Sequence, residues 1–140
     1  LAIFGIGIND ANVPPQKFDP ERFKAHYREL IALFKSANPH CALLFVTNND
    51  CLLNLGRRHG KRTNPNTARV AKAFKELAAE TGGAVWDQYH IMGGSRSSAL
   101  WRGKRLMRPD RIHFTAEGYH LIGDILYNAI ITDYLQADGN

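Results

Sequence analysis

The residues in this sequence best suited to chemistry are a carboxylate and an imidazole three positions apart, in Asp110-Arg111-Ile112-His113. Within one turn of backbone, side chains at this spacing lie on the same side, so the Asp110 carboxylate can accept a hydrogen bond from one ring nitrogen of His113. The other ring nitrogen is then basic, as a general base for a serine or water nucleophile requires. The alternative is that Asp110 and His113 only cap the following helix, since short motifs often match by chance.

A helix directly after this pair has to hold it in place. Thr115 is suited to the N-cap position, and Glu117 in the first turn complements the helix dipole. We expect the helix to run from about Ala116 to Tyr134. Its apolar positions, at helical spacing, are expected to be buried: Leu121, Ile122, Ile125, Leu126, Ala129 and Ile130.

Upstream of the pair, short apolar segments alternate with amphipathic ones. Residues 1–8, 41–47 and 84–87 are predicted to be buried strands, and helices are predicted to begin at Asp19-Pro20 and at Asn64-Pro65. Segments 52–63 and 88–109 are expected to be loops. Such alternation predicts an α/β layered fold with a parallel sheet in one domain over residues 1–140. Three strands make a thin sheet, so we expect the chain to be incomplete.

Polar residues follow two of these strands at the end where open parallel sheets bind ligands. Asn48 directly follows the second strand, and Gly7-Ile8-Asn9-Asp10 follows the first. Asn48 is therefore a candidate substrate-binding residue. Asn9 is either a turn residue paired with Asp10 or a hydrogen-bond donor to a ligand.

The composition excludes some classes of protein. The 140 residues are 44% hydrophobic and 22% charged, as in an ordinary globular domain, and no apolar run is long enough to span a bilayer. The net charge of +5 comes partly from basic residues at 57–62 and 102–108. Basic loops can bind nucleic acid, but the first cluster has no aromatic residues between its charges, so we expect neither a nucleic acid nor a membrane partner.

With Gly7-x-Asn9-Asp10 after its first strand and Asp110-x-x-His113 before its last helix, the chain resembles the SGNH (GDSL-type) esterase and lipase superfamily. Other segments resemble its carbohydrate-esterase branch: Ala84-Val85-Trp86-Asp87, Met92-Gly93-Gly94, Trp101 and Leu106-Met107. The resemblance covers essentially the whole chain. It implies a three-layer, flavodoxin-like α/β/α sandwich, with Asp110 and His113 as catalytic acid and base. It also places Gly7 and Asn9 in the oxyanion hole, where the Asn9 amide donates.

The chain departs from the family in lacking the Gly-Asp-Ser block that supplies the nucleophile and the second block, whose glycine is another oxyanion donor. By resemblance both belong upstream of Leu1, so the chain corresponds to the C-terminal portion of such an enzyme. None of its own serines follows a strand at the elbow a nucleophile needs, and we interpret them as ordinary polar residues: Ser36, Ser95, Ser97 and Ser98.

The resemblance implies a serine esterase that needs no cofactor and removes acetyl groups from an O-acetylated saccharide or cell-wall polymer, in a periplasmic or secreted setting. Trp101 and nearby basic residues could line the substrate groove, or Trp101 could pack the loop against the domain. Either a retained upstream segment or self-association is expected to cover the open edge of the sheet.

Two rival interpretations remain. One is a carbohydrate-binding relic that kept the fold and lost the nucleophile. The other is a metal site on Asp110, His113 and a further histidine such as His59 or His90, although no third ligand has a motif-like spacing.

Overall fold

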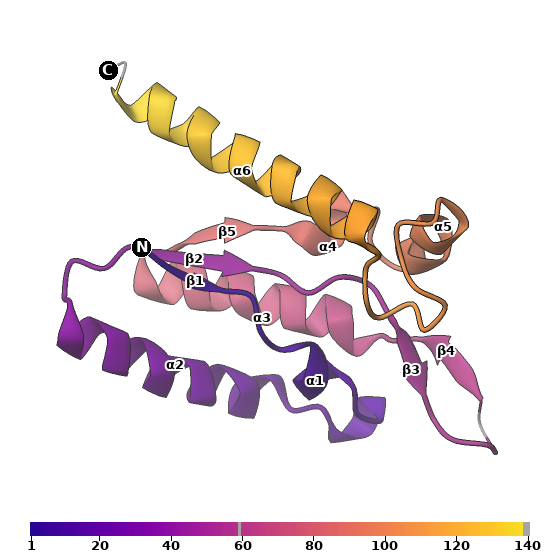
Figure 1. Cartoon of the computed structure of the whole chain (residues 1–140). Helices are drawn as coiled ribbons and strands as arrows, with labels where there is room; N and C mark the ends of the chain where they lie inside the picture. The colour runs from indigo at the N-terminus through magenta and orange to yellow at the C-terminus, as the bar shows by residue number, and fades with distance from the viewer. Residues whose placement is uncertain (59, 139–140) are drawn as a thin grey trace.

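A computed structural model describes residues 1–58 and 60–138, which form three layers. The middle layer is a parallel sheet of β1 (Ala2–Phe4), β2 (Leu43–Val46) and β5 (Ala84–Trp86), in the order β1-β2-β5. Helices α2 (Pro20–Ala37) and α3 (Asn66–Thr81) cover one face, and α6 (Ala116–Asp138) crosses the other (Figure 1). The predicted α/β fold with a parallel sheet is confirmed.

Local signals in the sequence set the helix boundaries. The Asp19 carboxylate accepts hydrogen bonds from the amides of Glu21 and Arg22, at 2.9 and 3.2 Å, and caps α2, which begins at Pro20 as expected. Helix α3 ends at Gly82, whose φ of 66° is a left-handed conformation that glycine adopts without strain. Both predicted helices are therefore present.

Aromatic rings fill the space between the sheet and the helices α2 and α3. Successive rings from β1, α2, β2 and α3 contact one another with centroids 4.8–6.1 Å apart: Phe4, Phe23, Tyr27, Phe45 and Phe74. All five residues are buried. Burial of one such side chain contributes about 2–3 kcal/mol, so this cluster is the main stabilising core and holds α2 and α3 firmly against the sheet.

Helix α6 packs less completely against the other face. Ile122 is buried there, whereas Leu121, which was expected to be buried, is exposed. At Gly118 the helix lies so close to the preceding loop that an added Cβ would be 2.0 Å from the carbonyl oxygen of Leu106. Among the described residues, no helix is long and apolar enough to cross a membrane.

The first strand is shorter and less covered than predicted. Of residues 1–8 only Ala2–Phe4 are extended, and the chain then turns at Gly7 into the short helix α1 (Ile8–Ala11). The prediction that this strand is covered on both faces is wrong: β1 is an edge strand, and the cluster that α6 forms with the sheet contains Leu44 of β2 and Trp86 of β5 but no described residue of β1. Leu1 and Ile3 are consequently 71% and 52% exposed.

Both predicted loops contain regular structure. Segment 52–63 is an antiparallel hairpin of β3 (Leu52–Asn54) and β4 (Lys61–Thr63), and it projects beyond the carboxyl ends of the sheet strands (Figure 1). Segment 88–109 contains α4 (Gln88–Ile91) and α5 (Ser97–Gly103). Outside these loops, a short 3₁₀ helix, Pro15–Lys17, precedes α2. These elements are too short for an apolar period to reveal them; tertiary contacts fix them instead.

Candidate active site

The Asp110–His113 turn has the geometry of an acid–base pair. Asp110 Oδ2 lies 3.0 Å from His113 Nδ1, and Oδ1 accepts from the amides of Ile112 and His113 at 2.8 and 3.0 Å. Partial burial raises the pKa of Asp110, but these hydrogen bonds outweigh it and hold the pKa at about 2. Since an ionised carboxylate only accepts, Nδ1 carries the proton, and Nε2 is left free to act as a base.

The chain around the turn is fixed by backbone and capping hydrogen bonds. The Arg108 amide donates to the His113 carbonyl at 2.8 Å, and an antiparallel bridge joins Met107 to Phe114. Thr115 Oγ1 accepts from the Gly118 amide at 3.2 Å, as expected of an N-cap. The turn is therefore anchored to the start of α6 on one side and to the preceding loop on the other.

A second Asp-x-x-His pair occurs at the carboxyl end of β5. Asp87 Oδ2 lies 2.7 Å from His90 Nδ1, and Asp87 also accepts from Thr47 Oγ1 and pairs with Lys75. Asp87 is thus a cap for α4 and part of an ion pair. His113 lines two cavities, and His90 lines neither of them. Spacing alone does not distinguish the two pairs, whereas their surroundings do.

Two cavities meet at His113. The smaller, of about 170 Å³, places His113 together with Asn9 and also includes Ile8, Asn12, Cys51 and Ile112. The larger, of about 250 Å³, places His113 together with Asn48; its lining includes Gly5, Gln88 and Tyr119. The structure therefore brings Asn9, Asn48 and His113 to one region, although they come from three separate parts of the sequence.

Gly7 and α1 position Asn9 beside this cavity. Gly7 has a φ of 136°, and an added Cβ would lie 3.2 Å from the Phe23 ring, so both backbone and space favour glycine. Buried Asn66 donates from Nδ2 to the carbonyls of Ala11 and Val13, which fixes α1 to the start of α3. The Asn9 side chain itself is exposed and makes no described hydrogen bond to Asp10, so the paired-turn interpretation has no support in the described residues.

Asn48 differs from Asn9 in being buried, with 5% of its surface exposed. Its Nδ2 has no hydrogen-bond partner among the described residues and lies 3.4 Å from the position of a Cβ on Gly7. A buried amide donor without a partner is costly, so this amide is available to donate to an acceptor from outside the described residues. Its neighbour Asn49 donates to the Ile112 carbonyl at 3.2 Å and so ties the end of β2 to the His113 turn.

Trp101 packs the loop instead of lining either cavity at His113. Its indole N–H donates to the Met92 carbonyl at 3.0 Å, and its ring contacts Phe114 edge-on at 5.6 Å. The ring is half-buried. Of the two roles considered for Trp101, the contacts favour the packing one.

A buried chain of polar contacts that the sequence does not predict lies behind the turn. Asp50, fully buried, accepts from the Ser98 amide at 3.0 Å. Ser98 Oγ in turn accepts from Nε and Nη2 of Arg111, at 3.3 and 2.9 Å. Arg111 lies inside the Asp110–His113 turn in a left-handed conformation, with φ of 56°. Ser98 is therefore a structural anchor for the turn and not a loop residue.

No local sequence pattern predicts these hydrogen bonds. Ser98 lies 13 residues before Arg111 and 48 after Asp50. The one signal in the sequence is the polar run after the second predicted strand. It contains Asp50 but does not indicate which residues Asp50 contacts. Ser97, next to Ser98, is equally buried, but its hydroxyl has no partner among the described residues.

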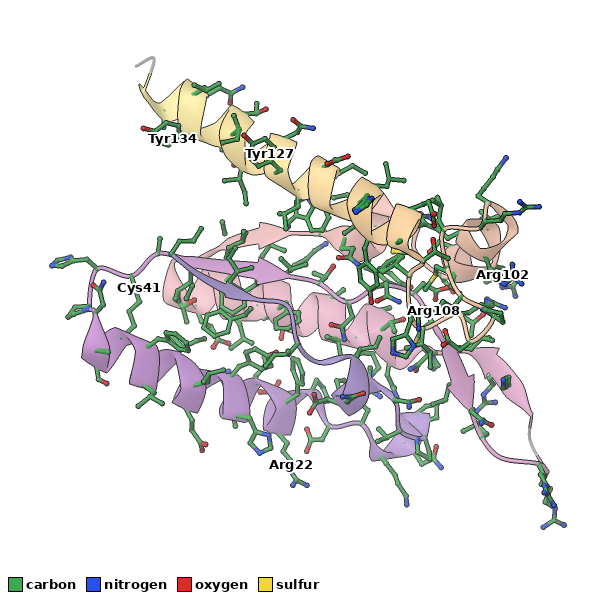
Figure 2. The ribbon with its side chains drawn as sticks, in the orientation of Figure 1. Arg22, Cys41, Arg102, Arg108, Tyr127 and Tyr134 are labelled. Carbon is green, nitrogen blue, oxygen red and sulfur yellow. The ribbon has the colours of Figure 1, made fainter. Side chains whose placement is uncertain are left out.

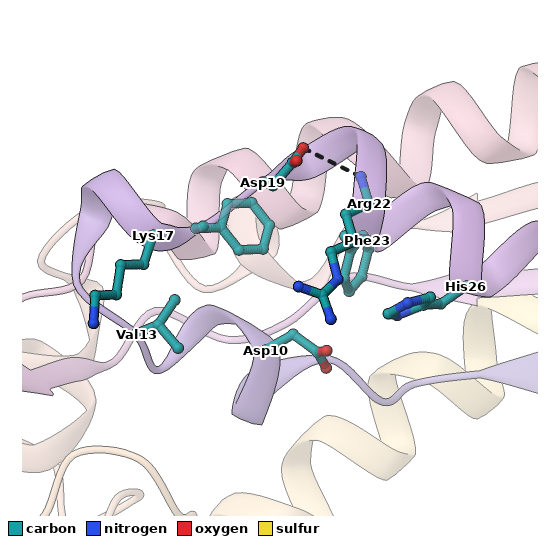
Figure 3. A pocket seen from close by; sticks show the side chains of 8 residues that line it. Asp10, Val13, Lys17, Asp19, Arg22, Phe23 and His26 are labelled. Carbon is teal, nitrogen blue, oxygen red and sulfur yellow. Dashed lines mark hydrogen bonds between the residues drawn. The ribbon is translucent and has the colours of Figure 1, made fainter.

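The largest cavity described, about 440 Å³, lies elsewhere, between α1 and the start of α2 (Figure 3). Asp10, Lys17, Arg22 and His26 bring both signs of charge to it. Neither member of the Asp110–His113 pair lines it, so its size does not make it the catalytic cavity. It adjoins the candidate site only through α1, which carries both Asn9 and Asp10.

A metal site is not supported within residues 1–58 and 60–138. That part of the chain has no cluster of three or more His, Cys, Asp or Glu side chains suited to a metal ion. His90 pairs with Asp87 and not with the Asp110–His113 turn, and His59 lies outside the described residues.

The fold and the family model place the chain in the SGNH (GDSL-type) class. The family model of the GDSL-like lipase/acylhydrolase family matches residues 1–121, and the chain belongs to that family. The family supports ester hydrolysis as the general chemistry. No curated protein matches the sequence.

Solved structures share the fold at low sequence identity. A peptidoglycan O-acetylesterase superposes with a TM-score of 0.74 at 19% identity, covering 93% of this chain and 37% of the other. A lipase/acylhydrolase from Enterococcus faecalis gives 0.63 at 20%, covering 91% and 59%, respectively. The esterase domain of the zebrafish ZfL2-1 retrotransposon ORF1 protein gives 0.59 at 17%, covering 91% and 66%. The chain thus spans between about a third and two thirds of these structures.

Proposed function

We propose that this chain supplies the base, the orienting acid and an oxyanion donor of a serine esterase, and that a segment outside this chain supplies the serine. The observation that carries the proposal is the Asp110–His113 pair. His113 has a free Nε2 and lines the same cavity as Asn9. A base beside an amide donor is what acyl transfer requires.

The reaction proceeds in two steps. His113 takes the proton of the serine as its oxygen attacks the ester carbonyl, and Asp110 stabilises the resulting imidazolium. The Asn9 amide donates to the developing oxyanion, an interaction whose loss typically costs about 10²–10³ in rate. The imidazolium then protonates the leaving alcohol, and water, deprotonated by His113, releases the acid from the acyl-serine.

The serines of this chain are poor candidates for the nucleophile. Ser97 and Ser98 are buried in α5, and Ser36 donates to the Leu33 carbonyl on α2. None of them, nor Ser95, lines either cavity at His113. These contacts favour a nucleophile from elsewhere.

The sheet offers a place where the segment carrying the serine could join. The outer edge of β1 has no strand partner among the described residues, and Ile3 and Ile6 beside it are 52% and 66% exposed. The unpartnered Asn48 amide lies beside Gly7, just beyond the carboxyl end of β1, and adds a donor there. Because the chain spans only part of its solved relatives, an upstream segment is the occupant we propose, with a second copy as the alternative.

We propose acetyl esters of a carbohydrate or cell-wall polymer, in a periplasmic or secreted setting, as the family resemblance implies. Similarity in fold to a peptidoglycan O-acetylesterase is compatible with this choice.

Labelling with a serine-reactive fluorophosphonate, followed by intact-mass spectrometry of the native protein, tests the proposal. We expect one adduct, on a polypeptide or upstream segment other than residues 1–140. If this chain is present with its complete native protein and no adduct forms, the esterase proposal fails. The result would then favour the carbohydrate-binding relic.

A further inference from the structure

Charge is distributed very unevenly over this chain. No Asp or Glu occurs between Cys51 and Lys75 or between Gln88 and Pro109. Nine exposed basic residues in the hairpin and in segment 88–109 define what we call the basic surface: Arg57, Arg58, Lys61, Arg62, Arg96, Arg102, Lys104, Arg105 and Arg108. The nine other Lys and Arg residues are outnumbered by the 13 Asp and Glu residues, so the positive net charge is concentrated here.

The cations of the basic surface have no acceptors within the described chain. None of their side chains makes a described hydrogen bond or ion pair. On α2 and α3, by contrast, Lys24 pairs with Glu21 and Glu76, and Arg28 pairs with Glu80. The basic surface is therefore free to bind an external anion, whereas the helical cations are largely occupied.

Two of these arginines occupy positions that their backbone would leave to glycine. Arg96 and Arg105 have φ values of 71° and 62°, in the left-handed region. Glycine adopts this conformation without the steric cost that a Cβ incurs. Since neither guanidinium has a described partner, local structure does not account for arginine at these positions.

The basic surface is attached directly to the candidate catalytic turn. The Leu52 amide at the base of the hairpin donates to the Arg111 carbonyl at 3.3 Å, and the Arg108 amide donates to the His113 carbonyl at 2.8 Å. Thr115 Oγ1 donates to the Arg105 carbonyl at 2.9 Å. Figure 2 shows Arg102 and Arg108 at the end of the molecule from which the hairpin projects.

We propose that this basic surface binds a polyanionic glycan, a saccharide chain bearing carboxylate groups, and so presents its ester groups to His113. The inference rests on the proposed function and specifies its substrate class. Guanidinium groups pair with carboxylates in two parallel hydrogen bonds, and seven of the nine cations are arginines. A nucleic acid fits less well, because the hairpin has no aromatic residue for base stacking and Trp101 is occupied with Met92 and Phe114.

Binding of an ester-free glycan tests this surface without requiring catalysis. The probe is a fluorescein-labelled oligogalacturonate of ten sugars, and fluorescence anisotropy measures its Kd for the 140-residue chain at several salt concentrations. We expect binding that weakens with added salt, because exposed charges are screened beyond ~10 Å at 0.1 M. Labelled dextran of equal length, which is neutral, should bind far more weakly.

Paired variants locate the site. Arg57→Gln/Arg58→Gln on the hairpin and Arg102→Gln/Arg108→Gln on the loop should each weaken oligogalacturonate binding by about fivefold. The control Lys17→Gln/Arg22→Gln removes the same charge from the cavity near α1 and should change the Kd less than about twofold. Equal effects of all three pairs would overturn the proposal.

Two further outcomes separate the hypotheses. Tighter binding of a single-stranded DNA decamer than of oligogalacturonate would overturn the glycan assignment in favour of nucleic acid. Hydrolysis of acetyl esters without oligogalacturonate binding would overturn this inference and leave the proposed function intact. Salt-sensitive oligogalacturonate binding in a native protein that fluorophosphonate does not label would support this surface and contradict the esterase.

Discussion

Two adjacent buried serines, Ser97 and Ser98, are expected to differ in how much stability the chain loses when their hydroxyl groups are removed. Ser98→Ala removes the oxygen that accepts from Nε and Nη2 of Arg111 at 3.3 and 2.9 Å, leaving a half-buried guanidinium short of two acceptor contacts. Hydrogen bonds to charged groups are worth about 1.5–3 kcal/mol, and one of these is long, so we expect a loss of about 2 kcal/mol. Ser97→Ala removes a hydroxyl that has no described partner and should change stability by less than about 0.5 kcal/mol.

Urea unfolding of both variants measures this difference. The midpoint should fall for Ser98→Ala with an unchanged m-value, which corresponds to about 6 °C in Tm for a chain of this size. Amide hydrogen exchange supplies a readout specific to the turn. The amides of Ile112 and His113, which donate to Asp110, should exchange faster in Ser98→Ala than in Ser97→Ala. Equal losses of stability in the two variants would refute the view that Ser98 anchors Arg111.

Three further effects follow from the structure. The pKa of Asp110 is about 2 against an ordinary 3.8, so its contribution to the free energy of unfolding is present above about pH 4 and is lost as pH falls through about 2. In unfolding measured over a series of acid pH values, the stability difference between wild type and Asp110→Asn, about 1 kcal/mol for so exposed a pair, should vanish over that range. A difference that does not change with pH would contradict this. In thermal unfolding, Gly118→Ala should destabilise the chain by at least about 3 kcal/mol, because its Cβ would meet the backbone of the preceding loop. Gly123→Ala has open space around its Cβ and should stabilise the chain by about 0.5–1 kcal/mol. Equal effects of the two variants would be inconsistent with the packing of α6. Burial raises the pKa of Cys51 to about 11, so a thiol reagent at pH 8 should modify half-buried Cys41 and spare Cys51, and rapid modification of both thiols would show that the region around Cys51 opens.

Features set by neighbours in the sequence were predictable. The caps at Asp19 and Thr115 and the bond between Asp110 and His113 each depend on residues two or three positions apart, and the structure contains all of them. The parallel sheet followed from the alternation of apolar segments and amphipathic helices. The catalytic role of the pair remains a prediction.

Features set by contacts between distant residues were not predictable. The hairpin buries Leu53 against the domain, and α5 is held by the hydrogen bond from the Ser98 amide to Asp50 across 48 residues. The meeting of Asn9 and Asn48 around His113 likewise depends on the order of strands in the sheet. Periodicity in short segments carries none of this information.

The exposure of β1 shows a different limit. The apolar run at residues 1–8 predicts a strand covered on both faces. Such a run indicates that a strand is buried but does not identify the element that covers it. In this chain Leu1, Ile3 and Ile6 remain exposed along the edge. The same edge is where we propose that the segment carrying the serine packs.

We propose His113, and not the equally spaced His90, as the catalytic base. Hydrolysis of p-nitrophenyl acetate by the native protein containing this chain, compared between His113→Gln and His90→Gln, tests it most directly. We expect His113→Gln to lower kcat/KM by at least about 10⁴-fold and His90→Gln to stay near wild type. Retained activity in His113→Gln, or an equal loss in His90→Gln with both proteins folded, would contradict it.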